Sequence, residues 1–121
     1  MDMKIIAIPI FGDRISPRLE FATNLKLFEV GKHKVLNSEI IRLVSHNRLE
    51  KINMIIGAKP NVIICDGLSK IFEAEIRKTN IKLISWVHGE VDEILHKYLS
   101  GTLKTESKLT RINCDKNYSE K

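Results

Sequence analysis

Three short segments of the sequence carry the residue types that could do chemistry, and each segment contains a glycine. They are Phe11–Arg18, Cys65–Ser69 and Trp86–Glu90. Arg14 and Arg18 in the first segment could neutralise an anionic ligand. Cys65 and His88 in the other two are side chains that bind soft metal ions. The glycines would let a ligand approach main-chain N–H groups closely: Gly12, Gly67 and Gly89.

Apolar runs precede these segments and predict the strands that position them. The runs are short and rich in β-branched residues, as in strands buried on both faces: Lys4–Pro9, Asn61–Cys65 and Ile81–Ser85. Pro9 is expected to end regular pairing on its side of the first strand, because it cannot donate a hydrogen bond. Two further runs, Leu25–Val30 and Lys34–Leu43, predict a hairpin with a short turn at Gly31. Ligands of open α/β sheets bind beyond the carboxyl ends of the parallel strands, so the three segments are expected to meet there.

Three helices are expected to alternate with the later strands. The first covers about residues 45–56, and the second covers about 69–79 with Asp66 or Ser69 as its N-cap. The third has the most regular apolar spacing in the chain: Val91, Ile94, Leu95, Tyr98 and Leu99. Gly101 follows it as a stop signal. Short apolar strands that alternate with helices predict an α/β domain whose sheet is covered by helices.

The charge balance is moderately basic. The 121 residues hold 20 Lys and Arg against 15 Asp and Glu, a formal net charge of +5. Residues 1–100 carry fifteen basic and twelve acidic side chains, and the last twenty-one residues carry five and three. The basic residues are interleaved with acidic ones and have few aromatic neighbours, so the sequence gives only a weak signal for a nucleic-acid-binding surface.

Length and residue usage exclude several classes of protein. A chain of 121 residues forms one domain, expected over residues 1–101, and a flexible polar tail is expected over 102–121, where the apolar periodicity stops. No apolar run approaches the roughly 20 residues of a membrane span, and the N-terminus lacks the pattern of a secretory signal. Two cysteines do not make a disulfide framework, so we expect a cytoplasmic protein with reduced thiols.

Three stretches also form an ordered set of motifs. They are Ile8–Arg18 (IPIFGDRISPR) followed by Phe21 and Ala22, then Val62–Leu68 (VIICDGL), then Ile84–Val91 (ISWVHGEV) with Tyr98–Gly101 (YLSG). In this order they resemble the dinitrogenase iron–molybdenum cofactor biosynthesis family, which includes nitrogenase accessory proteins and the C-terminal part of the cofactor synthase. The resemblance spans about residues 3–103. In the second motif this chain has Asp66 where the family more often has a glycine.

The resemblance implies a ribonuclease H-like α/β fold with a five-stranded mixed sheet and three helices. The implied strand order is 3-2-1-4-5, with the second strand antiparallel. It also implies a protein that holds, carries or inserts an iron–sulfur or iron–molybdenum type cluster, with cofactor donor or acceptor proteins as partners and no catalysis of its own. Nitrogenase-associated members often have His-Phe-Gly in the first loop, where this chain has Arg18, Leu19 and Glu20. Arginine can hydrogen-bond a cluster sulfide or a molybdate oxygen but cannot ligate iron.

We therefore expect a metal–sulfur cluster or a small anion at the loops after the first, fourth and fifth strands. Arg14 and Arg18 would neutralise its charge, and Cys65 and His88 are the coordinating candidates. The simpler interpretations are that Cys65 is a core hydrophobe and that His88 caps its turn.

Two other function classes remain as alternatives: a divalent-metal nuclease and a nucleic-acid-binding module. A nuclease needs clustered carboxylates, and Lys4–Pro9 contains no acidic residue. Asp66 and Glu90 are already accounted for as residues that favour helix N-termini. Neither a dinucleotide-binding fingerprint nor a P-loop is present in the sequence.

Overall fold

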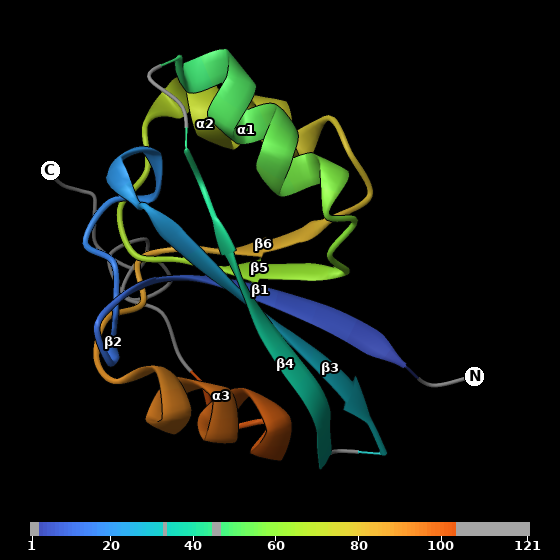
Figure 1. The fold of residues 1–121 in the computed structure, drawn as a ribbon. Coiled ribbons are helices and arrows are strands. Elements are labelled where there is room, and N and C mark those ends of the chain that lie inside the picture. Colours follow the sequence, from blue (N-terminus) through green and yellow to red (C-terminus); the bar gives the residue numbers. More distant parts are fainter. Residues whose placement is uncertain (1–2, 33, 45–46, 104–121) are drawn as a thin grey trace, which may run out of the picture.

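A mixed β-sheet runs through the centre of the molecule, with helices on both of its faces (Figure 1). The computed structural model describes residues 3–32, 34–44 and 47–103. The strands within these residues are β1 (Lys4–Phe11), β2 (Arg14–Ile15), β3 (Asn24–Gly31), β4 (Lys34–Arg42), β5 (Val62–Ile64) and β6 (Lys82–Ile84). The helices are α1 (Arg48–Gly57), α2 (Lys70–Arg77), α3 (Val91–Ser100) and a short 3-10 helix, η1 (Leu19–Phe21).

The strands lie in the order β4-β3-β1-β5-β6, and β2 pairs with β1 beside this path. β3 is antiparallel to both β1 and β4, whereas β1, β5 and β6 are parallel to one another. The sheet thus has six strands where the sequence predicts five. The additional strand is β2, whose two residues are too few to show any periodicity in the sequence.

The first strand extends two residues beyond the expected Lys4–Pro9. β1 continues to Phe11, and its pairing with β3 extends as far as Ile10 opposite Asn24. The carbonyl of Pro9 accepts the N–H of Ser16 at 2.8 Å. Because the N–H and C=O of a strand residue point to the same side, the missing N–H of proline faces the segment after β2 and not β3. The pairing of β1 with β3 is therefore undisturbed.

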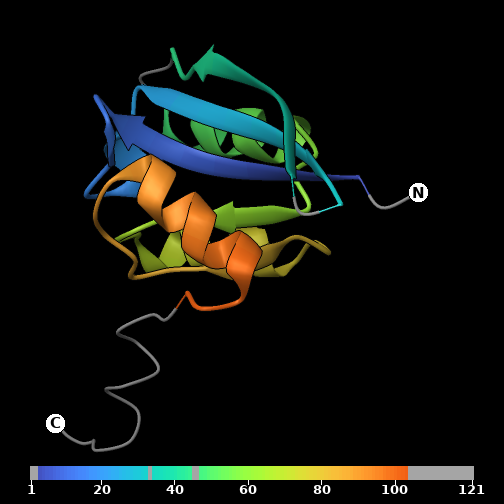
Figure 2. The same ribbon diagram turned by 90° about the horizontal axis from the view of Figure 1, so that it is seen from below.

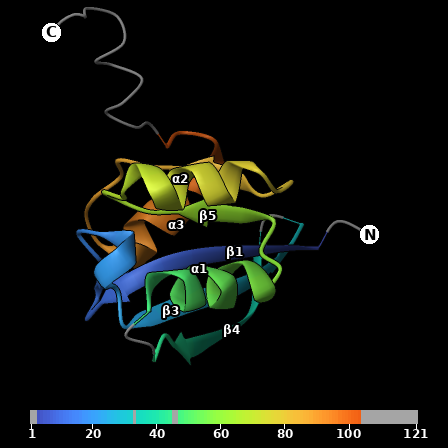
Figure 3. The same cartoon turned by 90° about the horizontal axis from the view of Figure 1, so that it is seen from above.

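α1 and α2 cover one face of the sheet, and α3 covers the other (Figures 2 and 3). Alternation along β1 supplies both cores, because Ala7 packs in the core with α1 and α2, while Ile6 and Ile8 pack in the core with α3. All three side chains are fully buried. β1 therefore lies at the centre of the fold, and the loops that follow β1, β5 and β6 leave the sheet at the same edge.

The helices begin and end at residues that satisfy free main-chain groups. Asn47 caps α1 by accepting the N–H of Leu49 at 2.8 Å, so this helix begins three residues later than expected. Ser69 caps α2 by accepting the N–H of Phe72 at 3.3 Å. Gly101 follows α3 with a φ of +79°, the left-handed conformation typical of a helix C-terminus.

The expected tail, residues 102–121, falls almost entirely outside the described residues, of which Thr102 and Leu103 are the last. α3 ends just before it, at Ser100. In the part of the chain that the structure describes, no helix has both the length and the apolar character needed to cross a membrane.

Candidate functional site

The three glycine-containing segments meet at one edge of the sheet, where main-chain hydrogen bonds join them. We call this region the loop edge and define it as residues 11–18, 65–69 and 86–90. The N–H of Ile15 donates to the carbonyl of Gly89 at 2.9 Å. The N–H of Val91, the first residue of α3, donates to the carbonyl of Asp13 at 3.0 Å. These two bonds join the first segment to the third.

The second segment is joined to both of the others. Gly67 donates its N–H to the carbonyl of Pro17 at 2.9 Å, and its own carbonyl accepts the N–H of Leu19 at 2.8 Å. Trp86 donates its N–H to the carbonyl of Asp66 at 3.0 Å. The three segments of the loop edge are therefore held together by main-chain hydrogen bonds.

These bonds change one expectation about the site. Several N–H groups that a ligand was expected to reach already have partners inside the protein. The N–H of Gly67 is used by Pro17 and that of Val91 by Asp13. The N–H of Ser69, at the start of α2, donates to the carboxylate of Glu20 at 3.0 Å. An anion at the loop edge would meet side chains rather than these main-chain donors.

The glycines of the loop edge also have steric roles. Gly12 forms the turn between β1 and β2 with a φ of +64°, and Gly89 has a φ of +127°. At Gly67 a Cβ atom would lie only 3.1 Å from the carbonyl oxygen of Pro17 and 3.6 Å from the ring of Trp86. Glycine at position 67 therefore permits the close approach of the first and second segments.

Arg18 lies within the loop edge and is held by a buried carboxylate. Its Nη2 donates to Oε2 of Glu20 at 2.7 Å, and its guanidinium carbon lies 5.9 Å from the centre of the Phe21 ring. The Arg18 side chain is 48% exposed, whereas that of Glu20 is only 4% exposed. The main-chain carbonyl of Glu20 also accepts a hydrogen bond from Nζ of Lys51 at 3.0 Å. The guanidinium is thus fixed on its protein side and open to solvent on the other.

The surroundings of Glu20 keep this carboxylate ionised. Burial by itself would raise its pKa, but the hydrogen bonds from Arg18 and from main-chain N–H groups, with the charge of Arg18, lower the pKa below the ordinary value of 4.5. The carboxylate also lies at the start of α2, where the helix dipole favours negative charge. Glu20 is in effect an internal anion that compensates part of the Arg18 charge.

Two aromatic side chains flank Arg18. Phe21 is 68% exposed and Trp86 is 44% exposed. Trp86 has a φ of +65°, a conformation that is rare for a bulky side chain. The Trp86 ring and the Arg18 side chain both border the space above Gly67. The result is a partly exposed patch in which the Arg18 guanidinium lies over the Phe21 ring, while the base of its side chain and the Trp86 ring lie beside Gly67.

Arg14 lies at the tip of the β1–β2 hairpin, where it is paired in register with Phe11. Both side chains are exposed. Among the described residues, Arg14 has no ion-pair partner within 4 Å. Arg14 is therefore the more available of the two cations to a ligand.

The two coordinating candidates, Cys65 and His88, lie in different environments. The thiol of Cys65 is fully buried in the core that the sheet forms with α1 and α2. Burial raises the pKa of Cys65 to about 12, and nearby carboxylates add to this effect. His88 is exposed and lines a cavity of about 260 Å³ together with residues of α3, on the other face of the sheet. The two side chains do not converge on one site.

These residues do not fit direct ligation of a metal–sulfur cluster. A cluster is held by thiolates or imidazoles that reach its iron atoms. The described residues contain no group of three or more His, Cys, Asp or Glu side chains that could hold a metal ion. The thiol of Cys65 is both buried and protonated at neutral pH. The loop edge instead fits recognition of an anion by guanidinium hydrogen bonds and aromatic contacts.

Sequence analysis missed three residues of this region: Glu20, Phe21 and Lys51. A glutamate between two apolar residues is normally interpreted as exposed. No local sequence pattern predicts that Lys51 of α1 contacts Glu20 of η1. The one usable signal is the Arg-x-Glu spacing of Arg18 and Glu20, which places opposite charges two residues apart.

Comparison with known proteins identifies the fold. No protein-family model matches the chain, and no curated protein matches its sequence. The crystal structure of PH0822 matches with a TM-score of 0.78 at 16% identity, covering 84% of this chain and 94% of that one. A provisionally assigned dinitrogenase from Methanocaldococcus jannaschii matches with a TM-score of 0.71 at 22% identity, covering 86% and 95%. The apo form of the orange protein from Desulfovibrio gigas matches with a TM-score of 0.71 at 15% identity, covering 85% and 92%. At these identities the likeness establishes a shared fold.

Proposed function

We propose that this protein carries an anionic metal–sulfur or molybdenum-containing group, held at the loop edge by Arg14, Arg18 and the flanking aromatic rings. The group is cargo, bound without ligation of its metal and without a reaction of its own, so the protein is a carrier and not an enzyme. Proteins that donate or accept the cargo would be its partners, in the cytoplasm. The observation that carries the proposal is the Arg18 guanidinium, fixed by Glu20 on one side and open to solvent on the other.

The likeness to known structures supports this proposal. One matching structure is provisionally named a dinitrogenase, and another is the apo form of the orange protein. The motifs of this sequence resemble the same cofactor-biosynthesis family. The strand order β4-β3-β1-β5-β6, with β3 antiparallel to its neighbours, supports a ribonuclease H-like assignment as part of the same proposal.

The chemistry of the loop edge suits such a cargo. A guanidinium presents several N–H donors in one plane, which matches the oxygen or sulfur atoms at the surface of an anionic cluster. The rings of Phe21 and Trp86 exclude part of the surrounding water, and hydrogen bonds to charge are stronger where water is excluded. A cluster held in this way can be released without breaking a metal–ligand bond, as a carrier requires.

Acidic residues in the same segments determine how the cargo would be recognised. Asp13, Asp66 and Glu90 offset the charges of Arg14 and Arg18, so the region has no strong net field to attract an anion from a distance. Binding therefore depends on short-range contacts to the guanidinium groups. We expect its affinity to depend only weakly on salt, because few screened long-range charges contribute.

The nuclease and nucleic-acid alternatives are not favoured. Within the described ranges, the carboxylates form no group that could hold a divalent ion.

Metal uptake tests the proposal. The full-length protein is incubated anaerobically with iron, sulfide and molybdate, desalted, and examined by metal analysis and visible absorption. The wild type is expected to retain metal, and Arg14→Gln combined with Arg18→Gln and Glu20→Gln is expected to reduce retention about tenfold or more, since hydrogen bonds to charged groups are lost. Replacing Glu20 together with Arg18 avoids leaving a buried carboxylate without its counter-ion.

A matched variant separates recognition from ligation. The double variant Cys65→Ala, His88→Ala is expected to retain as much metal as the wild type, because neither side chain ligates in this proposal. The proposal fails if the wild type retains no metal. It also fails if metal is lost from the Cys65, His88 variant and kept by the arginine variant.

A further inference from the structure

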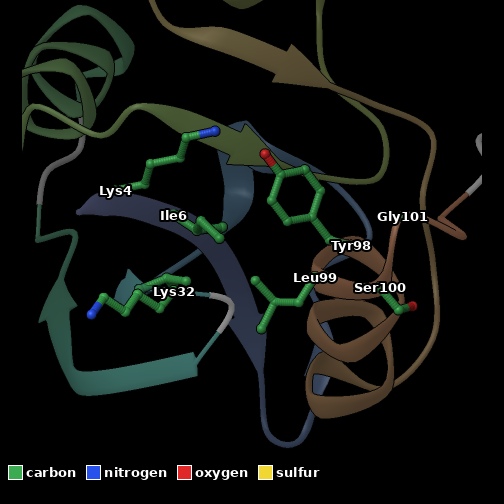
Figure 4. A pocket seen from close by; sticks show the side chains of 8 residues that line it. Lys4, Ile6, Lys32, Tyr98, Leu99, Ser100 and Gly101 are labelled. Atoms are coloured by element: carbon green, nitrogen blue, oxygen red, sulfur yellow. The ribbon is translucent and has the colours of Figure 1, made fainter. Parts of the chain in front are cut away.

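A second cavity lies at the end of the sheet opposite the loop edge (Figure 4). Its volume is about 630 Å³, within the range of pockets that bind small molecules. It lies where the last turn of α3 passes the beginning of β1 and the end of β3. Three apolar side chains line it, namely Ile6, Val30 and Leu99. No residue of the loop edge lines this cavity, so it is separate from the site described above.

Two polar groups face each other across the apolar part of the cavity. Figure 4 shows the ammonium of Lys4 and the hydroxyl of Tyr98 pointing toward one another from opposite sides, with Ile6 between them. Lys32 also lines the cavity, but its ammonium points away from it. Within the described residues, neither the Lys4 nor the Tyr98 side chain has a hydrogen-bond or ion-pair partner. The cavity therefore combines one available positive charge, one hydroxyl and an apolar wall.

The end of α3 opposes a negative charge at this position less than an uncapped helix end would. Carbonyl groups at a helix C-terminus carry partial negative charge, which would disfavour an adjacent anion. Here the carbonyl of Lys97 accepts the N–H groups of Gly101 and Thr102, so it is already satisfied. The ring of Tyr98 also carries its hydroxyl away from the helix backbone and toward Lys4 (Figure 4).

We propose that this cavity binds a small amphipathic carboxylate. One carboxylate oxygen would accept from Nζ of Lys4 and the other from the hydroxyl of Tyr98, since a carboxylate offers an acceptor to each donor. The hydrocarbon chain would lie along Leu99 and the ring of Tyr98, which are partly exposed, and its burial there would remove apolar surface from water. A single negative charge matches the single available ammonium, whereas a bare phosphate would leave the apolar wall in contact with water.

Decanoate, kept below its micelle-forming concentration, is the probe, and decylammonium is the control with the same chain and the opposite charge. Decanoate titrated into 15N-labelled full-length protein is expected to shift the amide resonances of Ile6, Val30, Leu99 and Gly101 to saturation. Lys4→Gln is expected to weaken binding about tenfold, and Tyr98→Phe about fivefold, because each loses a hydrogen bond to a charged group. Lys70→Gln removes a positive charge at the start of α2 and is expected to leave the affinity unchanged.

Three results would overturn this proposal. They are equal affinities for decanoate and decylammonium, an unchanged decanoate affinity in Lys4→Gln, and amide shifts that map away from the cavity. Circular dichroism of each variant confirms that it is folded, which exposed Lys4 and half-buried Tyr98 should allow. Arg14→Gln is expected to bind decanoate like the wild type, so the outcome is independent of cargo binding at the loop edge.

Discussion

Glu20 links the stability of this protein to pH. Its pKa in the folded protein lies below the ordinary 4.5, so its ion pair and hydrogen bonds stabilise the fold above that value. This stabilisation is lost as the pH falls through the folded pKa. We expect Glu20→Gln to lower the free energy of unfolding by about 1.5–3 kcal/mol at neutral pH. The difference from the wild type should shrink in acid, which urea unfolding over a pH series measures.

Glu73→Gln is the matched control for that measurement. Glu73 forms an ion pair with Arg77 at 3.0 Å, but both side chains are well exposed. Removing this pair is expected to change the free energy of unfolding by no more than about 0.5 kcal/mol. A Glu20→Gln effect that stays constant from neutral to acidic pH would show that the carboxylate does not supply the stabilisation.

The thiol of Cys65 should be chemically silent in the folded protein. Thiolate is the reactive form, and burial raises the pKa of this thiol to about 12. In a Cys114→Ser variant, where Cys65 is the remaining cysteine, we expect iodoacetamide to label the protein no faster than it unfolds. Labelling in urea should be fast. Rapid labelling in native buffer would show instead that the thiol is accessible.

At the scale of single residues, the sequence predicts which loop a residue lies in more readily than whether its side chain is buried. The sequence predicts that Arg14 and Arg18 lie near the other two glycine segments, because strand ends and glycines are local signals. Whether Cys65 faces the core depends on the pairing of β5 with its neighbours, and this pairing is a tertiary property. The burial of Glu20 depends in the same way on α2 and on Arg18.

At the scale of the elements, we expect the contact between the first and second loop segments, at Pro17 and Gly67, to be the most sensitive to the addition of a methyl group. Gly67→Ala would bring Cβ to 3.1 Å from the main-chain oxygen of Pro17, which cannot move away as a side chain can. We expect a loss of about 1–3 kcal/mol in the free energy of unfolding. Gly57→Ala, at the end of α1 with no atom within 4 Å of the new Cβ, should instead gain up to about 1 kcal/mol. Effects of the same sign in urea unfolding would contradict this account.

Elements with a long periodic pattern were the predictable ones. α2 and α3 begin within one residue of the expected positions, because apolar spacing and a capping residue agree at each. β2 could not be predicted from the sequence, because two residues show no periodicity and are assigned as a strand through their pairing with β1. The sequence did not show that β1 would continue to Phe11, because a proline disturbs only one side of a strand and the neighbour on the other side is a tertiary property.

On the scale of the whole molecule, we expect the central and edge strands of the sheet to differ in their protection from amide hydrogen exchange. β1 pairs with β3 on one side and with β5 on the other, and Ile6, Ala7 and Ile8 are fully buried. Within the described residues, β4 pairs only with β3, and most of its side chains are exposed. We expect the β1 amides to exchange only through global unfolding and the outward amides of β4 to exchange orders of magnitude faster. Hydrogen–deuterium exchange followed by NMR measures both.

The exchange experiment also reports on self-association. Outward β4 amides that become protected as the protein concentration rises would show that two copies pair along this edge. Equal protection of β1 and β4 at all concentrations would contradict the picture of a sheet with one weak edge.

The main-chain bonds that join the three loop segments have a consequence for how such proteins diverge. A frame held by main-chain atoms does not depend on the identity of most side chains, which agrees with a shared fold at 15% identity. If the loop edge binds cargo as proposed, substitutions at exposed positions such as Arg14 or Phe21 would alter what is bound and leave these main-chain bonds in place. Selection for a different cargo would then act mainly on exposed side chains, and selection for the fold mainly on the main-chain bonds and the core.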